Sequence, residues 1–204
     1  NAAVVFNPSK ISLAKLKAAF AKAGYPNLSY FATDAVTNGV LATKQALATG
    51  VKLLVAVGGD GTIRGIVQAM FEERFEGTLG LVPLGTGNIL ARNLRIPIGN
   101  LERSIKRSFS GSEYGIDLGV AKAMNLLGDI NTYFFTGIAG LGMDARIMQR
   151  TLPALKRRVG WIAYIEGGFR SLPLKFERFD VVVDDQPHRV LKSYSILVGN
   201  AGWL

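Results

Sequence analysis

The glycine-rich sequence Val57-Gly58-Gly59-Asp60-Gly61-Thr62 lies between an apolar, strand-like run at residues 51–56 and a helix-like run at residues 62–70. Glycines allow the backbone to turn sharply and to approach a ligand closely. Thr62 is predicted to cap the helix, and the loop amides to face an anion, for which phosphate is the usual candidate. Such a turn would also occur in a protein that binds nothing there, because short motifs arise by chance.

Asp60 is the unusual member of this loop. A carboxylate repels phosphate unless it holds a metal ion or accepts a proton from an attacking hydroxyl group, and phosphoryl transfer requires both of these tasks. The alternative interpretation is an acidic residue that merely complements the dipole at the start of a helix. The position of Asp60 therefore favours phosphoryl transfer over simple anion binding.

Two further polar turns follow predicted strands. The sequence Gly85-Thr86-Gly87-Asn88 comes after a short apolar strand at residues 79–84 and opens a helix-like run, and Asn7-Pro8-Ser9-Lys10 follows a strand at residues 3–6. Open α/β folds bind their ligands at the carboxyl ends of parallel strands. We expect the three turns to lie side by side at one edge of a sheet.

Residues 1–110 alternate strands with helices. Ser12 is predicted to cap a helix that Gly24 ends, and a second helix is predicted at residues 37–49. A βαβ pattern of this kind predicts a parallel sheet with helices on both faces. We therefore expect residues 1–110 to form an α/β nucleotide-binding domain built on a doubly wound parallel sheet.

From residue 111 onward the pattern becomes mainly β. Two pairs of strands are predicted, residues 114–121 with 131–138 and residues 175–184 with 189–199. Helices are expected near residues 142–150 and 156–170. The only histidine, His188, lies in a predicted hairpin turn and is expected to be solvated. Residues 111–204 are thus predicted to form a second, mainly β domain, expected to bind the substrate.

Taken together, the motifs of the chain resemble the catalytic domain of the diacylglycerol kinase superfamily, which includes bacterial lipid kinases, sphingosine kinases and ceramide kinases and shares its fold with the NAD kinases. The matching pieces, in order, are Asn7-Pro8, Gly58-Gly59-Asp60-Gly61-Thr62, Pro83-Leu84-Gly85-Thr86-Gly87-Asn88, Ile116-Asp117-Leu118-Gly119 and Gly140-Leu141-Gly142-Met143-Asp144-Ala145. This resemblance implies an ATP-dependent, Mg²⁺-dependent lipid kinase that phosphorylates a diacylglycerol-like or sphingoid hydroxyl group.

The resemblance also implies roles for particular residues. Asp60 and Asp117 are the expected catalytic residues, and Asp60 is also a possible metal ligand. Arg64, which stands where the family commonly has a neutral amide, is expected to meet phosphate. The expected nucleotide-binding residues are Asn7, Ser9, Lys10, Thr33, Gly58, Gly59, Asp60, Gly61, Thr62, Arg64, Gly85, Thr86 and Asn88.

The chain departs from the family pattern at three places. Ile63-Arg64-Gly65 stands where Leu-Asn-Glu is common, and Ile89 stands where many members carry Asp, although sphingosine kinases are apolar there too. Family members also continue well beyond the point where this sequence stops. We therefore expect a fragment whose missing part carries the other metal-associated residues and an acidic catalytic residue.

The net charge of the chain is +9 over 204 residues. Residues 92–107 and 145–195 carry the excess, which fits an anionic lipid surface as a partner and fits a merely solvated basic face equally well. No motif interleaves aromatic and basic residues as nucleic-acid binding would require. Without cysteines or a long apolar run, the protein is expected to be cytoplasmic and peripherally membrane-associated; its oligomeric state is not predicted.

Two alternative functions remain open at this stage. Kinases of NAD or of sugar phosphates also use a Gly-Gly-Asp-Gly loop, although the sequence at residues 83–88 fits the lipid kinases better. A regulator that binds nucleotide or lipid without catalysis would retain the same fold. The signature of P-loop enzymes, Gly-x-x-x-x-Gly-Lys followed by Ser or Thr, does not occur.

Overall fold

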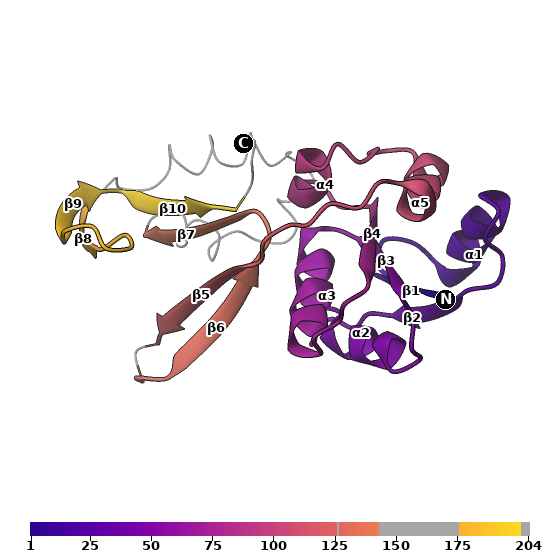
Figure 1. The fold of residues 1–204 in the computed structure, drawn as a ribbon, viewed down its shortest axis with the longest axis horizontal. Coiled ribbons are helices and arrows are strands. Elements are labelled where there is room, and N and C mark those ends of the chain that lie inside the picture. The colour runs from indigo at the N-terminus through magenta and orange to yellow at the C-terminus, as the bar shows by residue number, and fades with distance from the viewer. Residues whose placement is uncertain (126, 143–175, 201–204) are drawn as a thin grey trace. The chain divides into compact units, whose positions relative to one another are not determined.

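The computed structural model of the chain describes residues 1–125, 127–142 and 176–200 (Figure 1). They fall into two compact units, residues 1–137 with Asn200, and residues 138–199. Across these described residues, no helix is both long enough and apolar enough to span a bilayer. The predicted division near residue 110 stays a prediction.

The first unit is built on a parallel sheet of four strands in the order β2-β1-β3-β4. Its elements are β1 (Ala2–Phe6), α1 (Leu13–Lys22), β2 (Ser29–Ala32), α2 (Val40–Leu47), β3 (Leu53–Gly58), α3 (Asp60–Glu72), β4 (Thr78–Pro83), α4 (Ile89–Asn93) and α5 (Leu101–Ser110). The predicted parallel α/β sheet is confirmed. Helix α5 was not singled out by the sequence, because its polar composition hides the one apolar face that Ile105 and Leu101 present.

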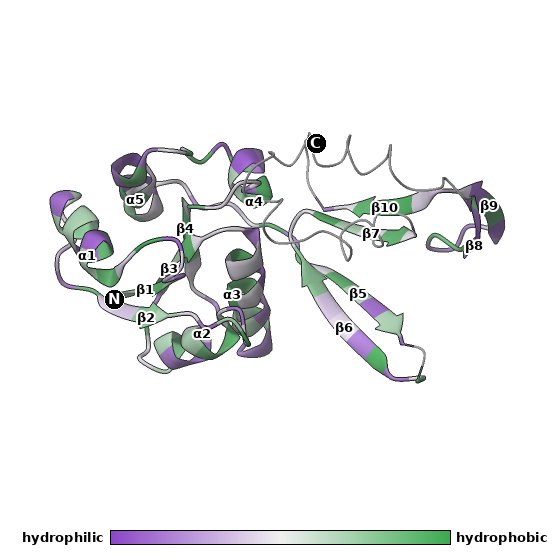
Figure 2. Ribbon diagram, turned by 180° about the vertical axis from the view of Figure 1, so that it is seen from behind, coloured by the Kyte–Doolittle hydropathy of each residue, from purple (hydrophilic) through white to green (hydrophobic). Residues whose placement is uncertain are grey.

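Side chains from alternate positions of the central strands fill two separate cores. Val5 and Ala56 belong to the core that α2, α3 and α4 cover, whereas Val4 and Val57 belong to the core that α1 and α5 cover. The inner strands are apolar along nearly their whole length, as a sheet buried on both faces requires (Figure 2). The sheet is therefore doubly wound, as the sequence predicted.

The ends of α1 agree with the prediction, but α2 begins later than predicted. In α1, the Ser12 hydroxyl accepts a hydrogen bond from the amide of Lys15, and Gly24 follows the helix with a φ of +99°. Helix α2 starts at Val40 instead of residue 37, because Asp34 holds the preceding segment in a turn. Its carboxylate accepts hydrogen bonds from the amides of Val36 and Thr37 and from the Thr37 hydroxyl, and these bonds lower the pKa of Asp34.

The start of α3 corrects the sequence analysis in one respect. The helix begins at Asp60 with Gly59 as its cap, so the prediction that Thr62 caps the helix is wrong. Thr62 lies in the first turn and is buried, and its hydroxyl accepts a hydrogen bond of 3.2 Å from the Asn7 side chain. The extended φ of Gly59 takes the chain from strand to helix within one residue, which leaves Thr62 inside the first turn.

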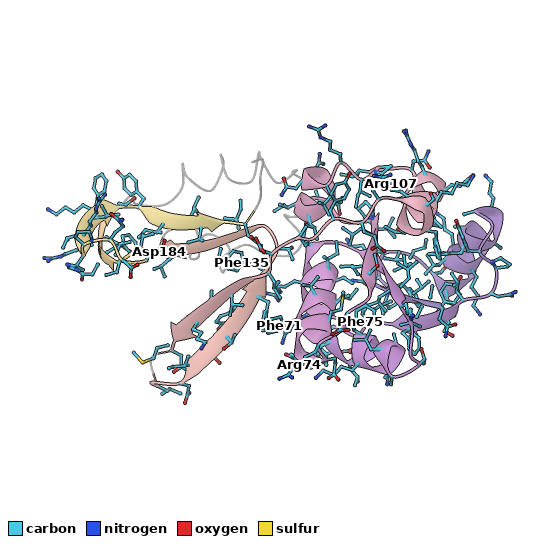
Figure 3. The ribbon with its side chains drawn as sticks, in the orientation of Figure 1. Phe71, Arg74, Phe75, Arg107, Phe135 and Asp184 are labelled. Atoms are coloured by element: carbon cyan, nitrogen blue, oxygen red, sulfur yellow. The ribbon has the colours of Figure 1, made fainter. Side chains whose placement is uncertain are left out.

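A β-hairpin completes the described first unit. Strands β5 (Gly119–Met124) and β6 (Ile130–Phe135) pair antiparallel, which confirms the first predicted pair, although β5 begins and ends later than predicted and β6 begins and ends earlier. The ring of Phe134 on β6 lies 5.3 Å, centre to centre, from that of Phe71 on α3, which is labelled in Figure 3. Aromatic contacts at this spacing are favourable and fix the base of the hairpin on the helix.

The second unit contains two antiparallel strand pairs among its described residues. Strand β8 (Glu177–Val181) pairs with β9 (Arg189–Ser193), and β10 (Ser195–Gly199) pairs with β7 (Ile138–Gly142). The predicted strand at 189–199 is thus divided at Tyr194, because its two halves pair with different partners. The side chain of His188 is 57% exposed and lies 3.2 Å from a carboxylate oxygen of Asp180, which confirms a solvated histidine. The helices predicted near 142–150 and 156–170 lie outside the described residues.

Gly65 provides a test of the close packing of α3 against the turn that contains Asn38. A Cβ atom at this position would lie 2.2 Å from the backbone oxygen of Asn38, whereas a Cβ at Gly61, on the same helix, would meet nothing within 4 Å. We expect Gly65→Ala to lower the free energy of unfolding by about 1–3 kcal/mol, as overpacking does. Gly61→Ala should leave it unchanged or raise it by about 0.5–1 kcal/mol. Thermal unfolding of the two variants measures the difference, and equal stabilities would contradict the contact.

Candidate functional site

The three polar turns meet at the carboxyl edge of the sheet. Phe6 at the end of β1 is in register with Val57 on β3, and Gly58 is in register with Pro83 on β4, so the turns start at the same level. The amide of Asn7 donates to the oxygen of Val57 at 2.9 Å, and the amide of Leu84 donates to that of Gly58 at 2.7 Å. The predicted juxtaposition of the turns is confirmed.

The two glycine loops touch backbone to backbone. A Cβ atom on Gly59 would lie 3.0 Å from the Cα of Gly85, and one on Gly85 would lie 2.6 Å from the Cα of Gly59. Any side chain at either position would push the loops apart. The glycines are therefore required for the close approach of one loop to the other, in addition to any contact with a ligand.

The carboxylate of Asp60 joins the first loop to the second. One of its oxygens accepts a hydrogen bond from the amide of Asn88 at 2.8 Å, and the other accepts one from the amide of Ile89 at 2.7 Å. Asp60 thus supplies the negative charge at the start of α4, which has no cap from its own Asn88. Each carboxylate oxygen offers about two acceptor positions, so one on each remains for a metal ion or a hydroxyl group.

Asn88 shapes the second loop from inside. Its side-chain oxygen accepts from the amide of Gly85 at 2.9 Å, and its side-chain nitrogen donates to the oxygen of Gly85 at 2.7 Å. The residue is 1% exposed and has a φ of +48°, a conformation that asparagine tolerates better than most residues. Asn88 therefore holds the loop that carries Thr86, which is itself exposed.

The turn after β1 is bound to the first turn of α3. The Asn7 side chain donates to the Thr62 hydroxyl and accepts from both the amide and the hydroxyl of Ser9, at 2.9 and 2.7 Å. Thr33, after β2, is buried, and its amide donates to the oxygen of Phe6 at 2.8 Å. Asn7, Ser9 and Thr62 thus form one hydrogen-bonded group.

The first turn of α3 is open to an anion. Helices α1 and α5 are capped by the side chains of Ser12 and Asn100, but α3 has no side-chain cap. The first amides of a helix lack partners within it and point toward the space before it. A Cβ atom on Gly61 would meet nothing within 4 Å, and the side chains of Lys10 and Arg64 are exposed.

Asp117 lies on an exposed segment that Asn200 holds in place. The side chain of Asn200 donates to the backbone oxygen of Asp117 at 2.7 Å, and its amide donates to that of Gly137 at 2.6 Å. A Cβ on Gly137 would lie 2.9 Å from the side chain of Ile89, next to the second loop. The described residues contain no direct contact between Asp117 and Asp60. Asn200 was missed as a site residue, although it too is a polar residue that directly follows a strand.

Within the ranges that the structure describes, no group of three or more His, Cys, Asp or Glu side chains is arranged to hold a metal ion.

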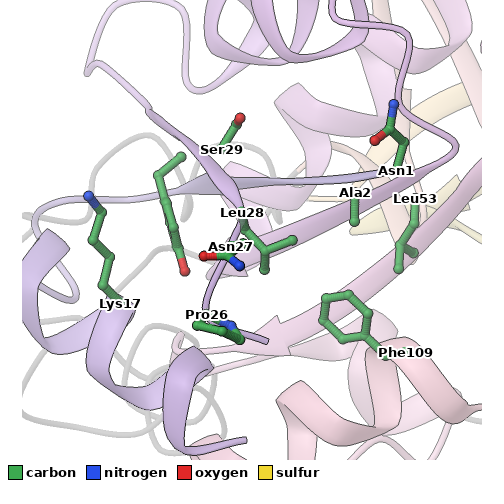
Figure 4. A pocket seen from close by; sticks show the side chains of 10 residues that line it. Asn1, Ala2, Lys17, Pro26, Asn27, Leu28, Ser29, Leu53 and Phe109 are labelled. Atoms are coloured by element: carbon green, nitrogen blue, oxygen red, sulfur yellow. The ribbon is translucent and has the colours of Figure 1, made fainter. Parts of the chain in front are cut away.

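A cavity of about 770 Å³ lies at the opposite edge of the sheet, where Ala2, Ser29 and Leu53 begin β1, β2 and β3 (Figure 4). Ligands of open α/β sheets bind at the carboxyl edge instead. The glycine loops, and not this cavity, are therefore the candidate active site.

Solved structures with the same fold are available for comparison. A crystal structure of a diacylglycerol kinase from Bacillus anthracis str. Sterne superimposes with a TM-score of 0.68 at 20% identity, covering 100% of this chain and 65% of that one. A second crystal structure from the same organism gives a TM-score of 0.73 at 20% identity and covers 66% of its chain. At this identity the likeness establishes the fold alone.

Sequence comparison goes further. The chain is 30% identical over 178 residues to the diacylglycerol kinase of Bacillus subtilis (strain 168), covering 84% of this chain and 55% of that one. It is 29% identical to the diacylglycerol kinase of Staphylococcus aureus (strain Newman), covering 53% of that enzyme. The chain thus spans about half the length of these curated relatives. The sequence model of the diacylglycerol kinase catalytic domain matches residues 2–121. Having this match and this fold, the chain belongs to the diacylglycerol kinase catalytic domain family.

Proposed function

We propose that the protein is an ATP-dependent lipid kinase that transfers the γ-phosphoryl group to the hydroxyl group of a diacylglycerol-like or sphingoid lipid. Membership of the family supports a kinase. The observation that carries the proposal is the position of Asp60, a carboxylate between two glycine loops that touch. Such an arrangement combines amide donors for phosphate with an acceptor for a metal ion or a hydroxyl proton.

In this proposal the first turn of α3 binds the phosphates of ATP. Its uncapped amides supply hydrogen bonds, and the space beside Gly61 allows the phosphate oxygens to approach. Lys10 and Arg64 add positive charge, and Thr86 contributes a hydroxyl group from the second loop. Asn7, Ser9 and Thr33 border the nucleotide. The positions of Gly58, Gly59, Gly85 and Asn88 fix the shape of the two loops.

Asp60 would bind Mg²⁺ or orient the lipid hydroxyl through the acceptor positions that Asn88 and Ile89 leave free. Mg²⁺ would neutralise the charge that develops on the transferred phosphoryl group. Within the described chain, no cluster of carboxylates offers a ready-made metal site, so the phosphates themselves would supply most of the ligands. Asp117 would lie near the lipid acceptor.

In this proposal the protein is cytoplasmic and binds to an anionic membrane surface, where it meets its lipid substrate. Exposed basic residues support this part of the proposal, since each Lys or Arg near such a surface contributes about 1 kcal/mol of binding. Two of them, Lys22 and Lys106, are engaged by Glu102 and contribute less.

The direct test is a transfer assay with the full-length protein, γ-labelled ATP and Mg²⁺. Diacylglycerol and sphingosine in anionic vesicles are compared with NAD and fructose phosphate in solution. We expect label in one lipid and in neither soluble acceptor. Label in NAD or in the sugar phosphate would establish a soluble-substrate kinase instead. ATP binding without transfer to any of the four would favour a regulator.

Asp60→Asn should lower kcat by about 100-fold or more, because the amide cannot bind the metal ion or accept the hydroxyl proton. The change also places an amide NH₂ against a backbone amide, so some stability will be lost. Asn88→Ala is the matched control, since it removes the hydrogen bonds inside the second loop without removing a charge. If Asp60 only joins the loops, the two variants will lose activity in proportion to the fall in their unfolding temperatures.

Arg64→Gln should raise the KM for ATP about tenfold at unchanged kcat, because a charge-assisted hydrogen bond to phosphate is lost. The arginine is exposed and makes no ion pair among the described residues, so its removal should leave stability unchanged. Arg74→Gln, beyond the opposite end of α3, alters the same charge at a distance from the loops. An equal effect of the two variants on KM would show that only the net charge matters.

A further inference from the structure

A second cavity, which we name the arginine pocket, lies at the far end of α4 from the glycine loops. Its volume is about 560 Å³. The end of α4, the connection to α5, α5 itself and the segment after it all contribute to its lining. The lining residues are Asn93, Leu94, Arg95, Pro97, Arg103, Arg107 and Tyr114.

No acidic side chain lines this pocket, although three arginines do. The one carboxylate of α5, Glu102, lies 2.8 Å from the Lys106 ammonium and 3.2 Å from that of Lys22. Glu102 therefore pairs with these two lysines and not with an arginine of the pocket. In the parts of the chain that the structure describes, Arg95, Arg103 and Arg107 form no ion pair.

The three charges repel one another in the absence of a bound anion. Arg103 and Arg107 stand four residues apart on α5, a spacing at which like charges destabilise a helix (Figure 3 labels Arg107). Arg95 adds a third charge from a residue with a φ of +52°, a backbone conformation that is unfavourable for arginine. A bound anion would convert this repulsion into attraction.

Asn93, which also lines the pocket, carries a donor that is closed off from solvent. The side-chain nitrogen of Asn93 is buried and has no hydrogen-bond partner. Leaving a buried N–H group without an acceptor is unfavourable, and such groups are rare in folded proteins. Three arginines without a carboxylate among the lining residues are suited to an oxyanion.

We propose that the arginine pocket binds a phosphomonoester, at a site separate from the glycine loops. The planar guanidinium groups would form paired hydrogen bonds with phosphate oxygens, and the Asn93 side chain, whose nitrogen is buried in the free protein, would turn to donate one more. Tyr114, Leu94 and Pro97 provide an apolar wall for the organic part of the ligand. The inference does not rest on the proposed kinase reaction, because none of these residues belongs to the loops that carry it.

The test uses phenyl phosphate as a soluble probe and phosphatidylcholine vesicles with or without phosphatidic acid as a membrane probe. Binding to the full-length protein is measured by titration calorimetry and by sedimentation with the vesicles. We compare the wild type with the double variant Arg103→Gln/Arg107→Gln. The control is Arg178→Gln, which alters one arginine on β8. The double variant should bind each probe at least about tenfold more weakly than the wild type does. The control variant should bind with the same affinity as the wild type.

Asn93→Leu gives a second, independent readout. Replacing an unsatisfied buried amide by an apolar group of similar size should raise the unfolding temperature of the free protein. The same change should weaken phosphate binding, a combination that a purely structural asparagine would not produce. It also keeps the test valid if the double variant fails to fold.

The outcomes separate the sources of the ligand. Binding of phenyl phosphate itself identifies a site for soluble phosphomonoesters, and binding only to vesicles with phosphatidic acid identifies a site for the lipid headgroup. Either result supports the proposal if the double variant loses it. Binding that is equal in the double variant and in Arg178→Gln would overturn it, as would the absence of binding to both probes.

Discussion

The hydrogen bonds that the Asp60 carboxylate accepts from the amides of Asn88 and Ile89 are the interaction on which the candidate site depends. They connect residues that are 28 and 29 positions apart in the sequence and belong to different strand-to-helix turns. Without them, α4 would begin without a cap, and the second loop would be held to the first only by the Leu84–Gly58 hydrogen bond and the contact of Gly59 with Gly85. The same carboxylate is the acidic group that phosphoryl transfer would use, so the structure and the proposed chemistry share one side chain.

Glycine makes this interaction possible. The loops approach until the Cα atoms of Gly59 and Gly85 leave no room for a side chain, and only at that spacing does Asp60 reach the start of α4. Asn88 completes the arrangement by bonding both polar groups of Gly85. Each loop is therefore rigid because of the other. Preorganised donors of this kind are what stabilises charge during a reaction, since they need no reorientation.

Most of this arrangement follows from local patterns. Apolar runs located the strands, and the polar turns after β1, β3 and β4 located the edge where the site lies. The bonding of Asp60 could not be predicted, because a carboxylate at a helix start has many possible partners and the sequence does not say which. Threonine is a residue type that often caps helices, yet the backbone conformation of Gly59 lets α3 begin at Asp60, two residues before Thr62. The strand at 189–199 was assigned as one element because its division at Tyr194 depends on which neighbour each half pairs with.

The close fit between Gly65 and Asn38 has a consequence for exchanging parts between relatives. Many members of the family carry a glutamate where this chain has Gly65, and the turn at residues 34–39 leaves no space for one. The helix and the turn therefore constrain each other, so that a side chain at position 65 needs a change in the turn as well. Placing the Leu-Asn-Glu sequence into this chain would therefore require a different turn before α2 as well.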